Sequence, residues 1–381
     1  MTPRERVVRA LSRREPDRVP VDIGGGASTS ISMEAYENLK RHLGVEGNTR
    51  EMSKLFRVAV VDEKVMQRLG SDCRPLRGKS PQRWTPPPSE PGTLVDMWGV
   101  QWRQQPVGEN GYYWEMTRNP LRDATLTDLA SYPWPDPLDP GFTSGLRAEA
   151  EALLGSTEYA VEASSGFYSF WELACMLRGL DQLLMDLVES PRFVNALLEK
   201  LLEINLAGTE RFLQEVGAYI QVYRTADDLA TQEGLLMSLE MYRSRLKPFH
   251  RRYFDFVKSH TSAAIVYHSC GNMVDLIDDL VEIGVDAINP VQVSAMPDTA
   301  HLKARFGNKV TFWGAIDTQH VLPRGSVSEV TAEVRKRIHD LAPGGGFVLG
   351  AVHSLQPDVP PENILAMADA ARAFGSYPIS V

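Results

Sequence analysis

One short motif, His268-Ser269-Cys270, carries the clearest chemistry in this sequence. It closes an apolar run that predicts a strand, and side chains two positions apart on a strand point to the same face. Imidazole and thiolate together are good ligands for zinc, which accepts nitrogen and sulfur donors. We predict His353, after the last apolar run, as the third ligand. The alternative is a packed thiol beside a hydrogen-bonded histidine, and the residues alone leave both interpretations open.

Polar side chains also follow the other apolar runs. Asp227-Asp228 could be paired carboxylates for acid–base work, although neighbours on a strand face opposite ways. We expect one of them, Asp228, to reach the site; alternatively, one caps the next helix and the other pairs with an arginine. The remaining candidates, as substrate ligands, are Glu162, Asn289, Gln292, Asp317 and Gln356. Asn289 and Gln292 could equally hold their loop in shape.

The elements that must position these residues alternate regularly along the chain. Six short apolar runs, each followed by a helical pattern, predict strands at 159–164, 218–224, 263–268, 285–289, 310–315 and 346–351. With a strand at 19–23 and a poorly marked one near 55–75, they predict a TIM (β/α)₈ barrel with a short helical N-terminal extension. Functional residues of such barrels lie at the carboxyl ends of the strands. No GxGxxG or GxxxxGKS motif supports a dinucleotide or P-loop site.

Residues 75–140 differ from the rest in their proline and aromatic content. Candidate strands at 95–102 and 112–116 flank a loop containing Gly108 and Asn110-Gly111, which predicts an antiparallel hairpin. We interpret this stretch as an insertion or lid over a barrel mouth, within one domain that spans 1–381. A surface ribbon that caps the barrel or makes a dimer contact is the alternative, and a homodimer is left open.

Composition narrows the classes of partner. The chain has 381 residues, is 43% hydrophobic, and carries a formal net charge of -9, which disfavours a nucleic-acid partner. No run of 18 or more apolar residues predicts a membrane span. The three cysteines, Cys73, Cys175 and Cys270, are too sparse for a disulfide framework and fit a reducing cytoplasm.

Several longer segments resemble the uroporphyrinogen-decarboxylase-like superfamily. They lie at 2–11, 15–21, 227–232, 268–271, 313–318, 342–346 and 353–364. The resemblance covers nearly the whole chain apart from 75–140. Decarboxylases of this superfamily bind a tetrapyrrole through arginines of a glycine-containing loop and a buried aspartate. The corresponding loop here, 24–30, holds no arginine, and unpaired substrate carboxylates would be costly to bury.

The motifs are also similar to the corrinoid-dependent methyltransferases of that superfamily, which act on methanol, methylamines and methoxylated aromatics. Their His-x-Cys motif is followed by a cysteine at the last strand, where this chain has His353. The resemblance implies zinc on His268, Cys270 and His353, catalytic roles for Asp228 and His268, and a corrinoid (cobalamin) protein as partner. We predict zinc-assisted methyl transfer between a small methoxyl or methylamine compound and that corrinoid. A metal-free carboxy-lyase is the first alternative, and a non-catalytic ligand-binding barrel the second.

Overall fold

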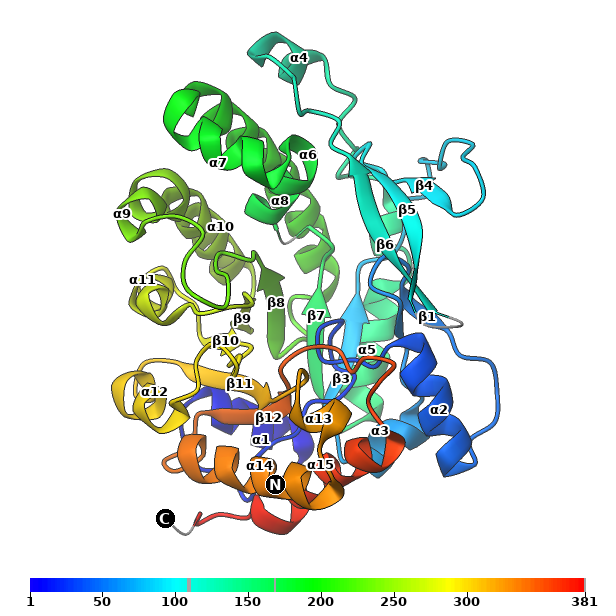
Figure 1. The fold of residues 1–381 in the computed structure, drawn as a ribbon, viewed down its shortest axis with the longest axis vertical. Helices are drawn as coiled ribbons and strands as arrows, with labels where there is room; N and C mark the ends of the chain where they lie inside the picture. Colours follow the sequence, from blue (N-terminus) through cyan, green and yellow to red (C-terminus); the bar gives the residue numbers. More distant parts are fainter. Residues whose placement is uncertain (108–110, 168, 380–381) are drawn as a thin grey trace.

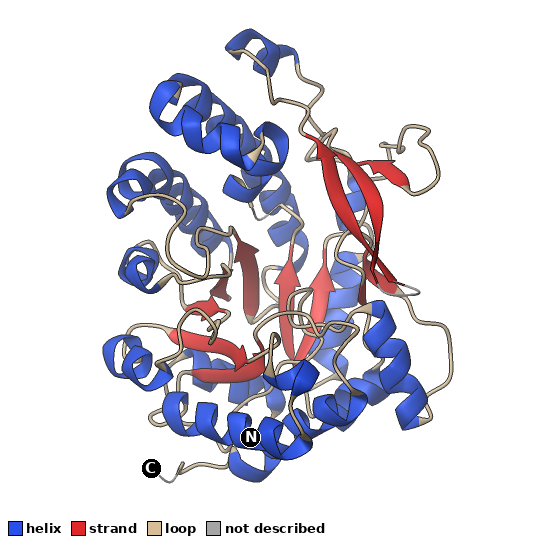
Figure 2. Cartoon of the chain, viewed as in Figure 1, coloured by secondary structure: helices blue, strands red, loops and turns tan. Residues whose placement is uncertain are grey.

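The computed structural model describes residues 1–107, 111–167 and 169–379. Within that part, a curled parallel sheet of seven strands runs in the order β12-β11-β10-β9-β8-β7-β3. The strands are β3 (Cys73–Arg77), β7 (Ala160–Ser164), β8 (Val222–Ala226), β9 (Ala264–His268), β10 (Ala287–Asn289), β11 (Thr311–Ile316) and β12 (Phe347–Ala351). Figure 2 shows these strands at the centre of the molecule with helices around them.

An extended segment around Val21 closes the gap between β12 and β3. The amide of Asp22 donates to the carbonyl of Leu349 on β12 at 2.8 Å, and the amide of Asp72 donates to the carbonyl of Val21 at 2.7 Å. The predicted barrel is therefore confirmed. The strand expected near 55–75 is β3, which begins only at Cys73, because two arginines and a proline hide its apolar character in the sequence.

The helices form the outer layer and carry the chain between strands (Figure 1). They are α1 (Pro3–Leu11), α2 (Met33–Leu43), α3 (Glu63–Leu69), α4 (Leu126–Ser131), α5 (Leu146–Ser156), α6 (Trp171–Arg178), α7 (Leu180–Glu189), α8 (Pro191–Val216), α9 (Leu239–Met241), α10 (Lys247–His260), α11 (Ile277–Glu282), α12 (Thr299–Phe306), α13 (Val321–Arg324), α14 (Val327–Leu341) and α15 (Pro361–Phe374). None of the helices described is both long and apolar enough to cross a membrane.

Side chains inside the barrel stack in layers, because inward positions recur every second residue of a strand. The lowest layer is apolar, and α1 closes the barrel beneath it through Val7, Ala10 and Leu11. The strand residues of this layer are Cys73, Ala160, Val222, Val266, Ala287, Trp313 and Val348. Two positions further along four of these strands stand the buried polar residues Glu162, Arg224, His268 and Asn289. An apolar layer thus lies directly beneath a polar layer.

The 75–140 segment contains an antiparallel sheet of β4 (Thr93–Val95), β5 (Gln101–Val107) and β6 (Gly111–Arg118). The predicted hairpin is confirmed, but its first strand at 95–102 was misplaced. Residues 96–100 form a turn instead, because the Asp96 carboxylate accepts hydrogen bonds from the amides of Trp98 and Val100. The loop residues Gly108 and Asn110 lie outside the described residues. Figure 1 shows this sheet standing beside the barrel, near the short hairpin of β1 (Glu51–Ser53) and β2 (Val58–Ala59).

Candidate metal centre

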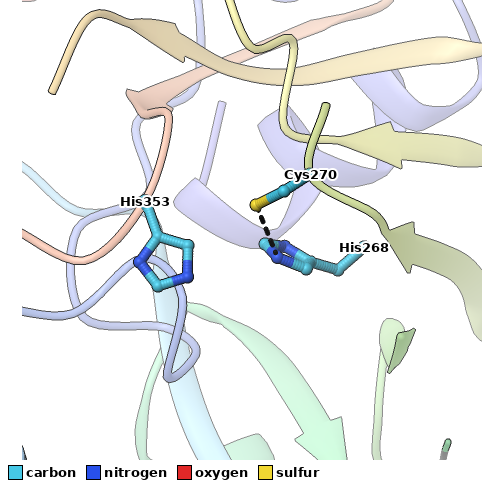
Figure 3. A group of neighbouring side chains, drawn as sticks. All are labelled: His268, Cys270 and His353. Carbon is cyan, nitrogen blue, oxygen red and sulfur yellow. Dashed lines mark hydrogen bonds between the residues drawn. The ribbon is translucent and has the colours of Figure 1, made fainter. Parts of the chain in front are cut away.

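Three predicted zinc ligands meet at the carboxyl ends of the barrel strands (Figure 3). Nε2 of His268 lies 3.6 Å from Sγ of Cys270, and the ring centroids of His268 and His353 are 5.7 Å apart. One ligand atom from each of the three residues lies within 4.8 Å of the other two. With Zn–N near 2.05 Å and Zn–S near 2.3 Å, tetrahedral nitrogen and sulfur ligands stand about 3.6 Å apart. The His268–Cys270 spacing therefore fits a zinc ion.

The amide of Asn289 fixes the tautomer of His268. Its Oδ1 accepts from Nδ1 of His268 at 2.7 Å and from Nη1 of Arg224 at 2.9 Å. Because an arginine can only donate, the oxygen of the amide must face this side, and His268 must carry its proton on Nδ1. The unprotonated Nε2 then faces Cys270, whose thiol can donate a hydrogen bond to it at 3.6 Å. A partner such as Asn289 orients a metal-binding histidine and raises its basicity.

The protonation states of the three ligands suit a cation. Burial lowers the pKa of His268, and burial together with His268 lowers the pKa of His353 to about 4. Both imidazoles are therefore neutral at pH 7 and keep a lone pair for a metal. Burial, with Asp228 and Glu172, raises the pKa of the Cys270 thiol to about 12. A cation binding there must displace the thiol proton, as metal sites with cysteine ligands do.

Three carboxylates, Asp228, Glu172 and Glu162, line the cavity. Oδ1 of Asp228 accepts from the amide of Cys270 at 2.8 Å, which ties the loop of Cys270 to the segment after β8. Glu172 lies in the first turn of α6, and burial together with Asp228 raises its pKa to about 8. Glu172 can therefore donate a proton at neutral pH. The sequence offered no signal for it, since it lies on a helix rather than at a strand end.

Asp227 takes the structural role that the sequence left open for one member of the acidic pair. Its Oδ1 accepts from the hydroxyl of Ser169 at 2.6 Å and from the amide of Glu172 at 2.7 Å. Its Oδ2 lies 3.0 Å from Nε2 of the buried His250. Asp227 thus caps the start of α6 and holds Glu172 against the cavity.

The cavity at this end of the barrel has a volume of about 130 Å³. Its wall includes Gly26 and Ser28 of the loop after the closing segment, and Phe56 and Arg77. Glu172, Asp228, His268 and His353 also line it. A cavity of about 150 Å³ in another protein holds one benzene molecule, so this one suits a molecule of about one ring. None of the lining residues described comes from β4, β5 or β6, so the predicted lid role stays a prediction.

Comparison with known proteins places this fold in a family. Residues 117–374 match the family model described as uroporphyrinogen decarboxylase (URO-D). The chain belongs to the URO-D family. Two curated relatives, both called uroporphyrinogen decarboxylase, come from Methylococcus capsulatus and Thioalkalivibrio sulfidiphilus. The first is 25% identical over 49% of this chain and 50% of its own length, and the second 26% identical over 26% and 27%.

The alignments thus span about half and about a quarter of the length of these two relatives. A solved structure of a methyltransferase from Methanosarcina mazei shares the URO-D-like fold with a TM-score of 0.65. It is 17% identical, and the match covers 98% of this chain and 99% of that one. At that identity the likeness establishes the fold and leaves the reaction to be argued from the site.

Among URO-D family features, the N-terminal loop lacks arginines, but the barrel interior supplies Arg224. The sequence placed Arg224 at the end of the strand predicted at 218–224 but suggested no role for it. Arg224 forms an ion pair with Glu162, and its Nη2 lies 3.5 Å from Oδ2 of Asp22. Burial, together with Glu162, raises the pKa of Asp22 to about 7. The Glu162 carboxylate already pairs with this guanidinium, so less of its charge is left for a substrate anion.

Of the five predicted substrate ligands, Glu162 alone belongs to the described cavity wall. Asn289 lies behind His268, and Oε1 of Gln292 accepts from the amide of Gly271 at 2.7 Å. Asp317 accepts from the amide of Gln319 at 2.7 Å, and the exposed Gln356 donates to the carbonyl of Ser354 at 3.0 Å. In this structure the last four form hydrogen bonds to His268 or to loops, and their role as substrate ligands stays a prediction.

Proposed function

We propose that this chain is a zinc-dependent methyltransferase. It moves a methyl group between a small methoxyl or methylamine compound and a corrinoid carried by a partner protein. The observation that carries the proposal is the convergence of His268, Cys270 and His353, with the amide of Asn289 setting the tautomer of His268. Zinc held by these residues would act as a Lewis acid toward the heteroatom that bears the methyl group.

The residues of the chain have separate tasks in this proposal. Asp228 fixes the loop of Cys270 through the Cys270 amide. When the carbon–heteroatom bond breaks, the heteroatom keeps the electron pair and needs a proton, which the neutral carboxyl of Glu172 supplies. Asp227 holds Glu172 in position. The partner must approach the open carboxyl end of the barrel, because its cobalt has to contact the methyl group.

Metal analysis tests the proposal directly. Elemental analysis of protein purified without chelator should find about one zinc per chain, and Cys270→Ala should reduce it to about a tenth or less. Cys175→Ala is the matched control, since this half-buried thiol lies on α6 outside the cluster. Methylation of free cob(I)alamin by methoxyl and methylamine compounds, followed by absorbance, then tests the reaction. Wild-type zinc below about a tenth of an equivalent would remove the metal mechanism.

A metal-free carboxy-lyase is the second candidate, and the names of the curated relatives favour it. Two observations oppose it. The cavity of about 130 Å³ is small for a tetrapyrrole, and Arg224 is already paired with Glu162 and Asp22. Release of carbon dioxide from uroporphyrinogen in the presence of a strong chelator would decide for this candidate.

A further inference from the structure

Arg77 is a cation in the cavity wall that the proposed mechanism does not use. It is the last residue of β3 and shares the inward face of that strand with Cys73. Arg74, on the opposite face, forms a two-pronged pair with Glu63 outside the barrel. Within the described chain, no carboxylate lies within 4.0 Å of the Arg77 guanidinium, and its one hydrogen bond goes to Sδ of Met52 at 3.3 Å.

The contrast with Arg224 makes this arrangement informative. Both guanidiniums line the same cavity, but Arg224 is paired with the Glu162 carboxylate and lies beside Asp22. Arg77 is half-buried and has five N–H donors, of which only Nη1 donates, to a thioether sulfur that is a weak acceptor. A cation withdrawn from water is costly unless an anion accompanies it. A ligand in the cavity is the partner that would complete the site.

The side chain of Phe56 adds an aromatic surface to the cavity wall that contains Arg77. Phe56, in the turn between β1 and β2, lines the cavity and is 51% exposed. A flat apolar ligand resting on this ring would bury both surfaces. Arg77 provides the planar, forked donor geometry that matches a carboxylate with two parallel hydrogen bonds.

We propose that the methylated substrate of this site is an aromatic carboxylate, with its carboxylate on Arg77 and its ring against Phe56. This inference rests on the proposed function, because it places the methoxyl or methylamine group of that substrate at the metal ligands. The cavity of about 130 Å³ has room for about one ring, which favours a substrate with a single aromatic ring.

Calorimetric titration with 4-methoxybenzoate and its neutral analogue 4-methoxybenzamide tests the inference. Wild-type protein should bind the acid about 10- to 100-fold more tightly than the amide. Arg77→Gln should lower the affinity for the acid to that for the amide and leave the affinity for the amide unchanged. Arg77→Lys should keep part of the preference for the acid. Arg118→Gln removes the same charge from an exposed position at the end of β6 outside the cavity wall, and should keep the full preference.

Phe56→Ala should weaken the binding of the acid and of the amide by the same factor, because it removes a contact with the ring of the ligand and not with its charge. Equal affinity of wild-type protein for both compounds, a preference that survives Arg77→Gln, or no binding of either up to about 10 mM would overturn the inference. Zinc content separates this result from the proposed function. One zinc per chain together with demethylation of neutral compounds only would support the proposed methyltransferase and refute the carboxylate site. A preference for the acid in a protein that binds no zinc would support the carboxylate site and refute the zinc-dependent methyltransferase.

Discussion

The support behind His268 can be tested by Asn289→Ala. Asn289 is fully buried, and its Oδ1 is the acceptor for both the His268 ring and Nη1 of Arg224. Truncation leaves these two buried donors without their acceptor. It also frees the His268 ring to rotate or to change tautomer. Zinc affinity should therefore fall in addition to folding stability.

The magnitude follows from these contacts. An orphaned buried donor costs about 1–3 kcal/mol, and more when it is charged, so the free energy of unfolding should fall by roughly 3–5 kcal/mol. Loss of the residue that orients a metal-binding histidine costs about 10- to 100-fold in metal affinity. Asn289→Asp should retain zinc binding, because a carboxylate can accept from both donors.

Zinc affinity is measured by competition with a chromogenic chelator, and stability by urea unfolding of the metal-free protein. Asn363→Ala is the matched control, because this buried amide donates to the carbonyls of Leu322 and Gly325 and not to His268, Cys270 or His353. It should lower stability by about 1–3 kcal/mol and leave zinc affinity unchanged. Zinc affinity of Asn289→Ala within about threefold of wild type would refute the role given to this amide.

Three further predictions use the same measurements. His353→Ala should lower zinc affinity by roughly 100-fold or more in the chelator competition, and unchanged affinity would remove His353 from the ligand set. The pKa of Asp22 is raised to about 7, so the folded chain retains a proton that the unfolded chain loses above about pH 4. Stability should therefore fall from about pH 4 to pH 7, by at most about 1.4 kcal/mol per pH unit, and Asp22→Asn should flatten this slope in urea titrations. A Cβ at Gly26 would lie 2.3 Å from Oε1 of Glu162, so Gly26→Ala should lower stability by about 1–3 kcal/mol. Gly155→Ala, in open space on α5, should not lower stability and should raise it by up to about 1 kcal/mol.

Local patterns in the sequence were enough to predict the barrel and the core of the site. Short apolar strands alternate with amphipathic helices, and this periodicity can be recognised in the sequence without any tertiary contact being known. His268 and Cys270 stand two positions apart at a strand end, so their approach follows from the pleat of a single strand. The inward apolar residue followed two positions later by a polar one, as in Val222 and Arg224, could also have been read from the sequence.

Other features depend on which strands become neighbours and in what register. The sequence predicted that Asn289 binds substrate or holds its loop in shape. In the structure β10 pairs with β9, so Asn289 lies beside His268 and its amide faces the imidazole. His353 reaches the cluster only because the barrel closes and brings the end of β12 toward that of β9. Arg77 lies at the end of β3, a strand that the sequence marks poorly. Only the closed barrel shows that its guanidinium lines the cavity without a carboxylate partner among the described residues. The chemistry of each side chain is thus encoded locally, whereas its partners are set by long-range pairing that one sequence does not reveal.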